Sequence, residues 1–352
     1  MITRDDQLMA FAPELQSAPW VALDTEADSL HTYPEKLCLV QLSIPGRDVL
    51  VDPLAQINLA PLWPVLTGHE LILHGADYDL HLLVEQAGFV PTAVFDTMLA
   101  ARILGYDRFG LGDLVTRHCG VTLEKGSQKA DWSRRPLTPK LEAYARNDTR
   151  YLKAIETILR AELTAKGRLA WHQEMCTRLV AETARATPVD PNEIWRVKGS
   201  FALSRPQLAV LREVWHWREQ EALASKRPPF FIMSHDALIG IARAAVAQQD
   251  LTPILPRKFY PPRRDRLEQA VGRGLAVPAN QQPLPPHREK HRMSYRQRKA
   301  FEALQGVRDR QATALMLDPS LIASKATLIA LASDGEVAWQ KIMSWQRDLM
   351  KG

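Results

Sequence analysis

The sequence predicts an α/β domain built on a mixed five-stranded sheet, followed by two all-α bundles of helices. In the first half, three β-rich runs precede two strand–helix units, which is typical of a sheet flanked by helices. In the second half, one stretch recurs at a fixed offset of 90 residues, which indicates two copies of a helical module. A chain of 352 residues is also longer than one hydrophobic core usually serves. We expect the sheet domain at 1–165, a helical linker at 166–202, and the two modules at 203–282 and 283–352.

Five apolar runs rich in β-forming residues predict the strands. They cover residues 20–24, 37–44, 48–52, 70–74 and 93–95. The turn residues Pro45-Gly46-Arg47 indicate that the second and third strands form a hairpin. The segment 28–36 is too short for a crossover helix, so the first strand is expected to pair antiparallel with the second.

Apolar residues at helical spacing and capping residues predict the helices of the sheet domain. They are expected at 77–86, from Asp96 or Thr97 to Leu104, at 111–118, and from Thr138-Pro139 to beyond Arg160. Thr138 is a natural cap, and Pro139 is tolerated in the first turn of a helix. Residues 120–136 are expected to form a loop.

The run Val21-Ala-Leu-Asp24-Thr-Glu26 brings two acidic residues to the end of a buried strand. Residues i and i+2 of a strand point to the same face, so Asp24 and Glu26 lie side by side. Two carboxylates this close repel each other, and burial of either one is costly without a counter-charge. A bound divalent cation, which takes oxygen ligands, resolves the conflict. The run therefore predicts a metal site.

Two further acidic residues stand on elements that can reach the same edge of the sheet. Asp79 falls in the first turn of the helix after the fourth strand, and Asp148 in the middle of the long helix. Tyr144 lies one turn before Asp148 on the same helical face. Taken singly, each has a simpler interpretation: Asp79 or Asp77 as a helix cap, Asp148 as a surface residue, Tyr144 as a core aromatic.

As a set, these residues resemble the three exonuclease motifs of the DEDD superfamily, in its tyrosine-bearing branch. The surrounding sequence is similar to bacterial ribonuclease D over about residues 1–165. The similarity is carried by the segments Leu23-Asp-Thr-Glu-Ala-Asp-Ser-Leu30, Cys38-Leu-Val-Gln-Leu42 and Trp132-Ser-Arg-Arg-Pro-Leu137. The resemblance implies an RNase H-like sheet and 3′→5′ hydrolysis of nucleic acid. It also implies two Mg²⁺ or Mn²⁺ ions, release of nucleoside 5′-monophosphates, and RNA with single-stranded 3′ ends, such as tRNA precursors, as the substrate.

The resemblance assigns a role to each acidic residue and to the tyrosine. Asp24 is expected to bridge both metals, and Glu26 to hold one of them and contact the terminal 3′-hydroxyl. Asp79 and Asp148 complete the coordination, and Tyr144 orients the attacking water. Asp79 is preferred to Asp77 because Leu80 continues the family pattern, whereas Asp77 is better interpreted as a helix cap.

Three residues just ahead of the long helix are candidate nucleic-acid contacts. Lys129 and Arg135 can clamp phosphates, and Trp132 can stack on a base. The alternative is structural: Trp132 packs beneath the loop, and Arg135 pairs with a surface acid.

Positive charge is concentrated late in the chain, although the formal net charge is only +5. Residues 251–300 hold 12 Lys/Arg against 3 Asp/Glu, a net of +9 that leaves −4 for the remainder. Such a segment suggests a polyanion partner, most simply nucleic acid, or else a solvated linker. The expected phosphate contacts in it are Arg257, Lys258, Arg263 and Arg264.

The repeat in the second half is specific. A gap-free stretch of 32 residues contains nine identities, which pair Arg218, Ala222, Ala224, Pro229, Ile232, Ser234, Leu238, Ile239 and Ala242 with the residues 90 positions later. Ser234 and Ser324 both stand where a helix cap belongs. The module resembles the HRDC domain of RecQ-type helicases and ribonuclease D. The second copy lacks the pair Trp215 and Trp217, which puts its contact with nucleic acid in doubt.

Several classes of protein are excluded or not expected. The three cysteines are far apart, so neither a zinc site nor a disulfide framework is expected, and a reducing cytoplasm fits. The sequence has no membrane-length apolar run and no phosphate-binding loop of the helicase type. We expect a monomer that binds RNA and no membrane. The competing hypotheses are a DEDD exonuclease that acts on DNA and a non-catalytic RNA-binding scaffold.

Overall fold

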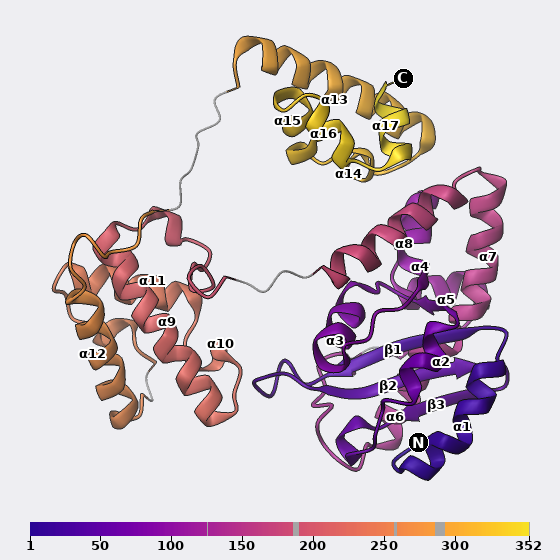
Figure 1. Ribbon diagram of the computed structural model, residues 1–352, viewed down its shortest axis with the longest axis horizontal. Helices are drawn as coiled ribbons and strands as arrows, with labels where there is room; N and C mark the ends of the chain where they lie inside the picture. Colours follow the sequence, from indigo (N-terminus) through magenta and orange to yellow (C-terminus); the bar gives the residue numbers. More distant parts are fainter. Residues whose placement is uncertain (125, 186–189, 257–258, 286–292, 352) are drawn as a thin grey trace. The chain divides into compact units, whose positions relative to one another are not determined.

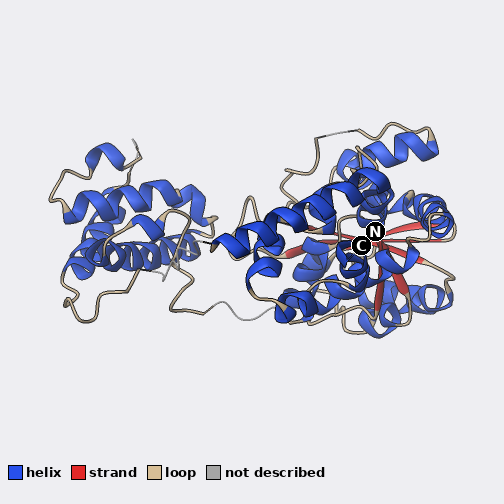
Figure 2. Ribbon diagram, turned by 90° about the horizontal axis from the view of Figure 1, so that it is seen from above, coloured by secondary structure: helices blue, strands red, loops and turns tan. Residues whose placement is uncertain are grey.

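The computed structural model describes residues 1–124, 126–185, 190–256, 259–285 and 293–351. The chain forms two compact units. The first contains Met1–Ala27, Leu37–Ala186 and His291–Gly352, and the second contains Asp28–Lys36 and Thr187–Lys290. The strands that the structure describes all belong to the first unit, as the red arrows of Figure 2 show.

Figure 1 labels most of the strands and helices, and its colours follow the sequence. In the sheet domain they are α1 (Asp5–Ser17), β1 (Val21–Ala27), β2 (Leu37–Ile44), β3 (Arg47–Val51), α2 (Leu62–Thr67), β4 (Glu70–Leu73), α3 (Asp77–Ala87), β5 (Ala93–Asp96), α4 (Thr97–Leu104), α5 (Leu111–Cys119), α6 (Pro139–Arg150), α7 (Leu152–Ala165) and α8 (Leu169–Ala184). The remaining helices are α9 (Arg205–Ser225), α10 (Pro229–Ile232), α11 (His235–Val246), α12 (Pro261–Leu275), α13 (Tyr295–Leu315), α14 (Pro319–Ile322), α15 (Lys325–Ser333), α16 (Glu336–Lys341) and α17 (Ser344–Lys351).

The five strands form one mixed sheet in the order β3-β2-β1-β4-β5. β1 pairs antiparallel with β2, and β2 pairs antiparallel with β3 across the hairpin. β4 runs parallel to β1 and to β5. The predicted mixed sheet, the hairpin and the antiparallel first pair are therefore confirmed. β1 is the central strand, with β2 on one side and β4 on the other.

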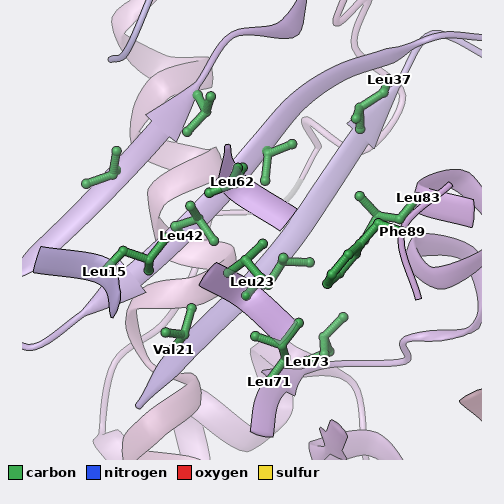
Figure 3. Close-up of a cluster of buried hydrophobic side chains, with 14 of the residues drawn as sticks. Leu15, Val21, Leu23, Leu37, Leu42, Leu62, Leu71, Leu73, Leu83 and Phe89 are labelled. Atoms are coloured by element: carbon green, nitrogen blue, oxygen red, sulfur yellow. The ribbon is translucent and has the colours of Figure 1, made fainter. Parts of the chain in front are cut away.

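Alternation along the strands divides the sheet into two covered faces. Val21 and Leu23 of β1 enter the large core that α1, α2 and α3 close, which Figure 3 shows. Ala22 packs on the opposite face against Leu152, the first residue of α7. Leu39 and Leu50 pack on that opposite face with Ala145 of α6. Asp24, an even-numbered residue of β1 like Ala22, therefore shares the face that α6 and α7 cover.

The helix that was expected to run from Thr138 to beyond Arg160 is two helices. It begins as predicted: the Thr138 side chain accepts a hydrogen bond from the Leu141 N–H at 3.3 Å, with Pro139 in the first turn. It ends at Arg150, and α7 starts at Leu152 after the intervening Tyr151. The break separates α6, which lies against β2 and β3, from α7, which lies against α4 and α5.

The two helical modules repeat each other element by element. α13, α14 and α15 each start 90 residues after α9, α10 and α11. Both long helices begin with a capping box, made by Ser204 with Gln207 and by Ser294 with Gln297. Ser234 and Ser324 cap the third helix of each copy, as predicted. Trp215 and Trp217 are core residues of the first copy, so their absence from the second does not bear on nucleic-acid contact.

The second module packs on the sheet domain. A shared core joins Ile103 and Leu159 to Ile322 and Trp345. The Arg168 guanidinium donates to the Ile103 carbonyl at 2.8 Å and to the Leu315 carbonyl at 2.9 Å. Among the described residues, no helix is long and apolar enough to cross a membrane.

Candidate metal centre and nuclease site

β1 carries two of the predicted acidic residues to one face of the sheet. Asp24 and Glu26 alternate with Leu23 and Thr25, so the two carboxylates share the face that α6 covers. Asp148, which is on α6, completes a cluster there. One ligand oxygen from each of these three carboxylates lies within 4.8 Å of the other two. The structure thus brings together residues that are more than 120 positions apart in the sequence.

Asp79 joins this cluster from the first turn of α3. It is 6% exposed, and its Oδ1 accepts hydrogen bonds from the Thr25 N–H at 2.9 Å and from the Thr25 hydroxyl at 2.6 Å. Thr25 is the residue between Asp24 and Glu26, so these two bonds hold Asp79 against the acidic end of β1. The negative charge of Asp79 raises the pKa of both Asp24 and Glu26.

The tight turn before α3 depends on a different aspartate. The Asp96 carboxylate accepts hydrogen bonds from the Gly75 N–H at 3.0 Å and the Ala76 N–H at 2.9 Å, and it also caps α4. The prediction that Asp77 caps α3 is wrong, because the helix has no side-chain cap and Asp77 is exposed beside His81. The preference for Asp79 over Asp77 agrees with the burial of Asp79.

The clustered carboxyl groups destabilise one another's charged forms. Burial first, and then repulsion from Asp148 and Asp79, raises the pKa of Glu26 to about 9. Burial raises the pKa of Asp79 to about 6, against the hydrogen bonds from Thr25, and that of Asp148 to about 7. Burial and the three neighbouring carboxylates also raise the pKa of Asp24 well above its ordinary range.

This donor set fits divalent cations of the hard type. Four carboxyl groups supply oxygen ligands, which Mg²⁺ and Mn²⁺ prefer, and Asp24, Glu26 and Asp148 include neither sulfur nor imidazole. Four negative charges in a largely buried place require an opposite charge of comparable size. Protonation is the alternative in the ion-free protein, which is why the pKa values are high. Asp24, Glu26, Asp79 and Asp148 are the residues that would hold the cations.

Tyr144 reaches the cluster from α6, one turn before Asp148. Its hydroxyl is half-buried, and the charges of Asp148, Glu26 and Asp24 raise its pKa after burial does. Gln128 donates a hydrogen bond to the hydroxyl, which acts in the opposite direction. The phenol therefore stays protonated at neutral pH beside the acidic groups.

Trp132 does not present its ring to a base. The side chain is 1% exposed and lies in the core with Leu39 and Leu50, 6.0 Å from the Tyr144 ring between centroids. The stacking prediction is wrong, because the loop folds the indole beneath itself. The structural alternative is correct, and Trp132 supports the ring of Tyr144 from behind.

Arg135 is also a structural residue. Its guanidinium donates to both carboxylate oxygens of Asp52, at 2.6 and 2.7 Å, and to the Cys38 carbonyl at 2.7 Å. Asp52 is 3% exposed, so the partner is a buried acid and not a surface one. These hydrogen bonds occupy the guanidinium and connect the loop to the sheet. They argue against the prediction that Arg135 clamps a phosphate.

The remaining predicted contacts with nucleic acid are placed in different ways. Lys129 is exposed on the loop before α6. On α12, Arg263 donates to Glu221 at 3.0 Å, whereas Arg264 is partly exposed and pairs with Glu268 on the same helix. Arg257 and Lys258 lie outside the described residues.

Two residues of the site were missed in the sequence. Thr25 lies between two acidic residues in the sequence. Strand alternation alone would have placed its side chain toward α3, where it binds Asp79. Gln41 is the one amide in the otherwise apolar or hydroxyl run 37–44, and it pairs with Asp24 across the sheet. A polar residue with a long side chain inside a buried strand is the signal that could have found it.

Comparison with known proteins gives the family. Residues 1–164 match the family model described as a 3′-5′ exonuclease, and residues 207–250 match the HRDC domain. Ribonuclease D of a Jannaschia species is 34% identical over 294 residues, which cover 80% of this chain and 76% of the relative. Ribonuclease D of Granulibacter bethesdensis is 30% identical over 360 residues, 99% of this chain and 90% of the relative. The chain belongs to the ribonuclease D family.

A solved structure agrees with this membership over the whole chain. Escherichia coli RNase D, described as an exoribonuclease involved in structured RNA processing, matches with a TM-score of 0.79 at 26% identity. The match covers 100% of this chain and 96% of that one. The ribonuclease D family therefore accounts for the sheet domain and for the helical modules together.

Proposed function

We propose that this member of the family is a 3′→5′ exoribonuclease that removes nucleotides one at a time from single-stranded 3′ ends, with tRNA precursors as a substrate. The observation that carries the proposal is the convergence of Asp24, Glu26 and Asp148 within 4.8 Å, with Asp79 held beside them. A non-catalytic scaffold would have no need of four carboxyl groups that raise one another's pKa.

The four carboxylates would hold two divalent cations. Bound there, the cations would lower the pKa of the attacking water and stabilise negative charge on the entering and leaving oxygens. Asp24 would serve as a ligand shared by both ions, and Glu26, Asp79 and Asp148 would supply the remaining carboxylate ligands. Glu26 also receives the hydroxyl of the terminal 3′ nucleotide.

Tyr144 positions the water. Because its pKa lies above the ordinary value of 10, the phenol keeps its proton at neutral pH and can hold the water by a hydrogen bond. The water oxygen bonds to phosphorus as the bond from phosphorus to the 3′ oxygen breaks. The released nucleotide keeps its phosphate on the 5′ oxygen, and the shortened chain ends in a 3′-hydroxyl.

The first helical module, at 203–282, is proposed to contribute RNA contacts. Arg264 on α12 is partly exposed and pairs with Glu268, so a phosphate would compete with that carboxylate for it, and the family model for the HRDC domain covers residues 207–250 of this module. The second module, at 283–352, is proposed to be mainly a support, since its core is continuous with that of the sheet domain.

The proposal is tested with a 5′-labelled single-stranded RNA and a DNA strand of the same sequence, incubated with the full chain and Mg²⁺ or Mn²⁺. A ladder that shortens from the 3′ end on RNA, and that EDTA and Asp148→Asn both abolish, is the expected result. Equal cleavage of the DNA would favour the DNA exonuclease. Binding of RNA without cleavage would favour the scaffold.

A further inference from the structure

Gln41 has a buried amide that lacks a hydrogen-bond partner in the part of the chain that the structure describes. The side chain is 0% exposed, and both its Nε2 and its Oε1 lack a partner among the described residues. An amide buried in this way destabilises the fold relative to one whose hydrogen bonds are made. Most buried polar groups in folded proteins are satisfied, so an orphaned one indicates a missing partner such as a water, an ion or a moved side chain.

The sheet register places Gln41 beside Asp24. Gln41 on β2 is the direct partner of Asp24 on β1 and of Leu50 on β3. Leu50 packs with Leu39 and Ala145 on the face that α6 covers, and Gln41 shares that face because it is two residues from Leu39. Directly opposite residues have Cβ atoms about 4.5–5.5 Å apart, well within the reach of a glutamine side chain.

The neighbouring polar residue on the same face shows what a structural role looks like. The Ser43 hydroxyl lies 2.7 Å from the Thr149 hydroxyl of α6 and donates to Asp48 at 2.7 Å. The polar contact between β2 and α6 is therefore complete at Ser43. It is incomplete at Gln41, which is the position opposite Asp24.

A carboxylate that holds a metal ion is usually fixed from behind by a hydrogen-bond donor, and loss of such a donor typically weakens metal affinity about 10–100-fold. The glutamine amide has two N–H donors, and an ionised carboxylate accepts at several lone pairs. Gln41 thus has the donor, the position and the unmet need for an acceptor.

We propose that Gln41 is a positioning residue of the metal centre, whose Nε2 donates a hydrogen bond to the carboxylate of Asp24 when the cations are bound. The inference rests on the proposed function, because it requires that the acidic cluster binds divalent cations. Gln41 acts on the reaction only through Asp24. It orients that carboxylate toward the ions.

The test compares the full chain with its Gln41→Met variant, which keeps the length of the side chain and removes the amide. Leu39→Met is the matched control, since Leu39 is equally buried on the same face of β2, opposite Glu26. Mn²⁺ binding is measured by calorimetry in the absence of RNA, and kcat and KM are measured on single-stranded RNA. The melting temperature is measured in EDTA.

The proposal predicts that Gln41→Met melts in EDTA at the same temperature as the unaltered chain or higher, because no hydrogen bond of the ion-free fold is lost. It predicts Mn²⁺ affinity 10–100-fold weaker and a lower kcat with KM unchanged, whereas Leu39→Met keeps the affinity. Unchanged Mn²⁺ affinity in Gln41→Met would overturn the inference. A variant that does not fold would also overturn it, since the amide would then serve the ion-free structure. Failure of the unaltered chain to bind Mn²⁺ would instead refute the proposed function.

Discussion

Replacement of Glu26 by glutamine is predicted to stabilise the ion-free protein while it abolishes cleavage. In the unfolded chain Glu26 has an ordinary pKa near 4.5, whereas burial and its acidic neighbours raise the folded value to about 9. Between these two pKa values, the folded state therefore keeps a proton on Glu26 that the unfolded state has released. Stability contributed by this protonated group is present below pH 4.5 and is lost as the pH rises toward 9. Glutamine does not titrate, so the variant does not lose this stability as the pH rises.

The size of the effect follows from the distance in pH. At pH 7 the pH lies roughly 2.5 units above the pKa of the unfolded glutamate. At about 1.36 kcal/mol per unit, the folded state loses about 3 kcal/mol of stability because Glu26 must stay protonated in it. At pH 5 the same reasoning gives less than about 1 kcal/mol. For a domain of this size 1 kcal/mol corresponds to about 2–4 °C, so Glu26→Gln should raise the melting temperature by roughly 6–12 °C at pH 7.

The assay is thermal unfolding in EDTA at pH 5 and pH 7. Glu182→Gln is the matched control, because that glutamate is exposed and pairs with Arg178 on the surface of α8, where a change of less than about 0.5 kcal/mol is expected. The same melts with Mn²⁺ should show a gain for the unaltered chain and little or none for Glu26→Gln. Equal melting temperatures of Glu26→Gln and the unaltered chain in EDTA at pH 7 would refute the electrostatic account of the cluster.

Four further substitutions test individual residues. Asp79→Asn should abolish cleavage of RNA with RNA binding kept, and Asp77→Asn should leave the rate unchanged; activity retained in the first and lost in the second would move the ligand to Asp77. Tyr144→Phe should lower kcat with little change in Mn²⁺ affinity by calorimetry, and an unaltered kcat would remove its role in orienting water. Arg135→Met should destabilise the chain by about 3–5 kcal/mol in thermal melts, because the buried Asp52 loses its counter-charge. A raised KM for RNA at unchanged stability would restore the phosphate-clamp hypothesis.

The mixed sheet with its hairpin and the elements that carry the acidic residues could be predicted because they depend on local patterns, whereas the roles of those residues were expected from the resemblance to a family. Asp24 and Glu26 follow a buried strand, and Asp148 and Tyr144 share a helical face, so periodicity alone predicts where they point. The start of α6 at Thr138-Pro139 was predictable for the same reason, since caps act within one turn. The repeat at an offset of 90 residues predicted two copies of one module, and α13, α14 and α15 do start 90 residues after α9, α10 and α11.

What could not be predicted depends on contacts between distant segments. Trp132 and Arg135 are an aromatic and a cation in a loop, a composition that suits RNA binding and loop packing equally well. Only the fold shows that Leu50 and Asp52 lie beneath that loop and take these side chains into the interior. The break at Tyr151 was missed because residues on both sides of it favour helix.

The account stands on the claim that the acidic cluster holds two cations, and a calorimetric titration of the full chain with Mn²⁺ at pH 7 tests it most directly. The prediction is two ions per chain, with proton release on binding because protonated carboxyl groups must ionise. Asp24→Asn, which removes the proposed shared ligand, should abolish binding of both. Absence of Mn²⁺ binding by the unaltered chain, or the same two-ion binding in Asp24→Asn, would contradict the account.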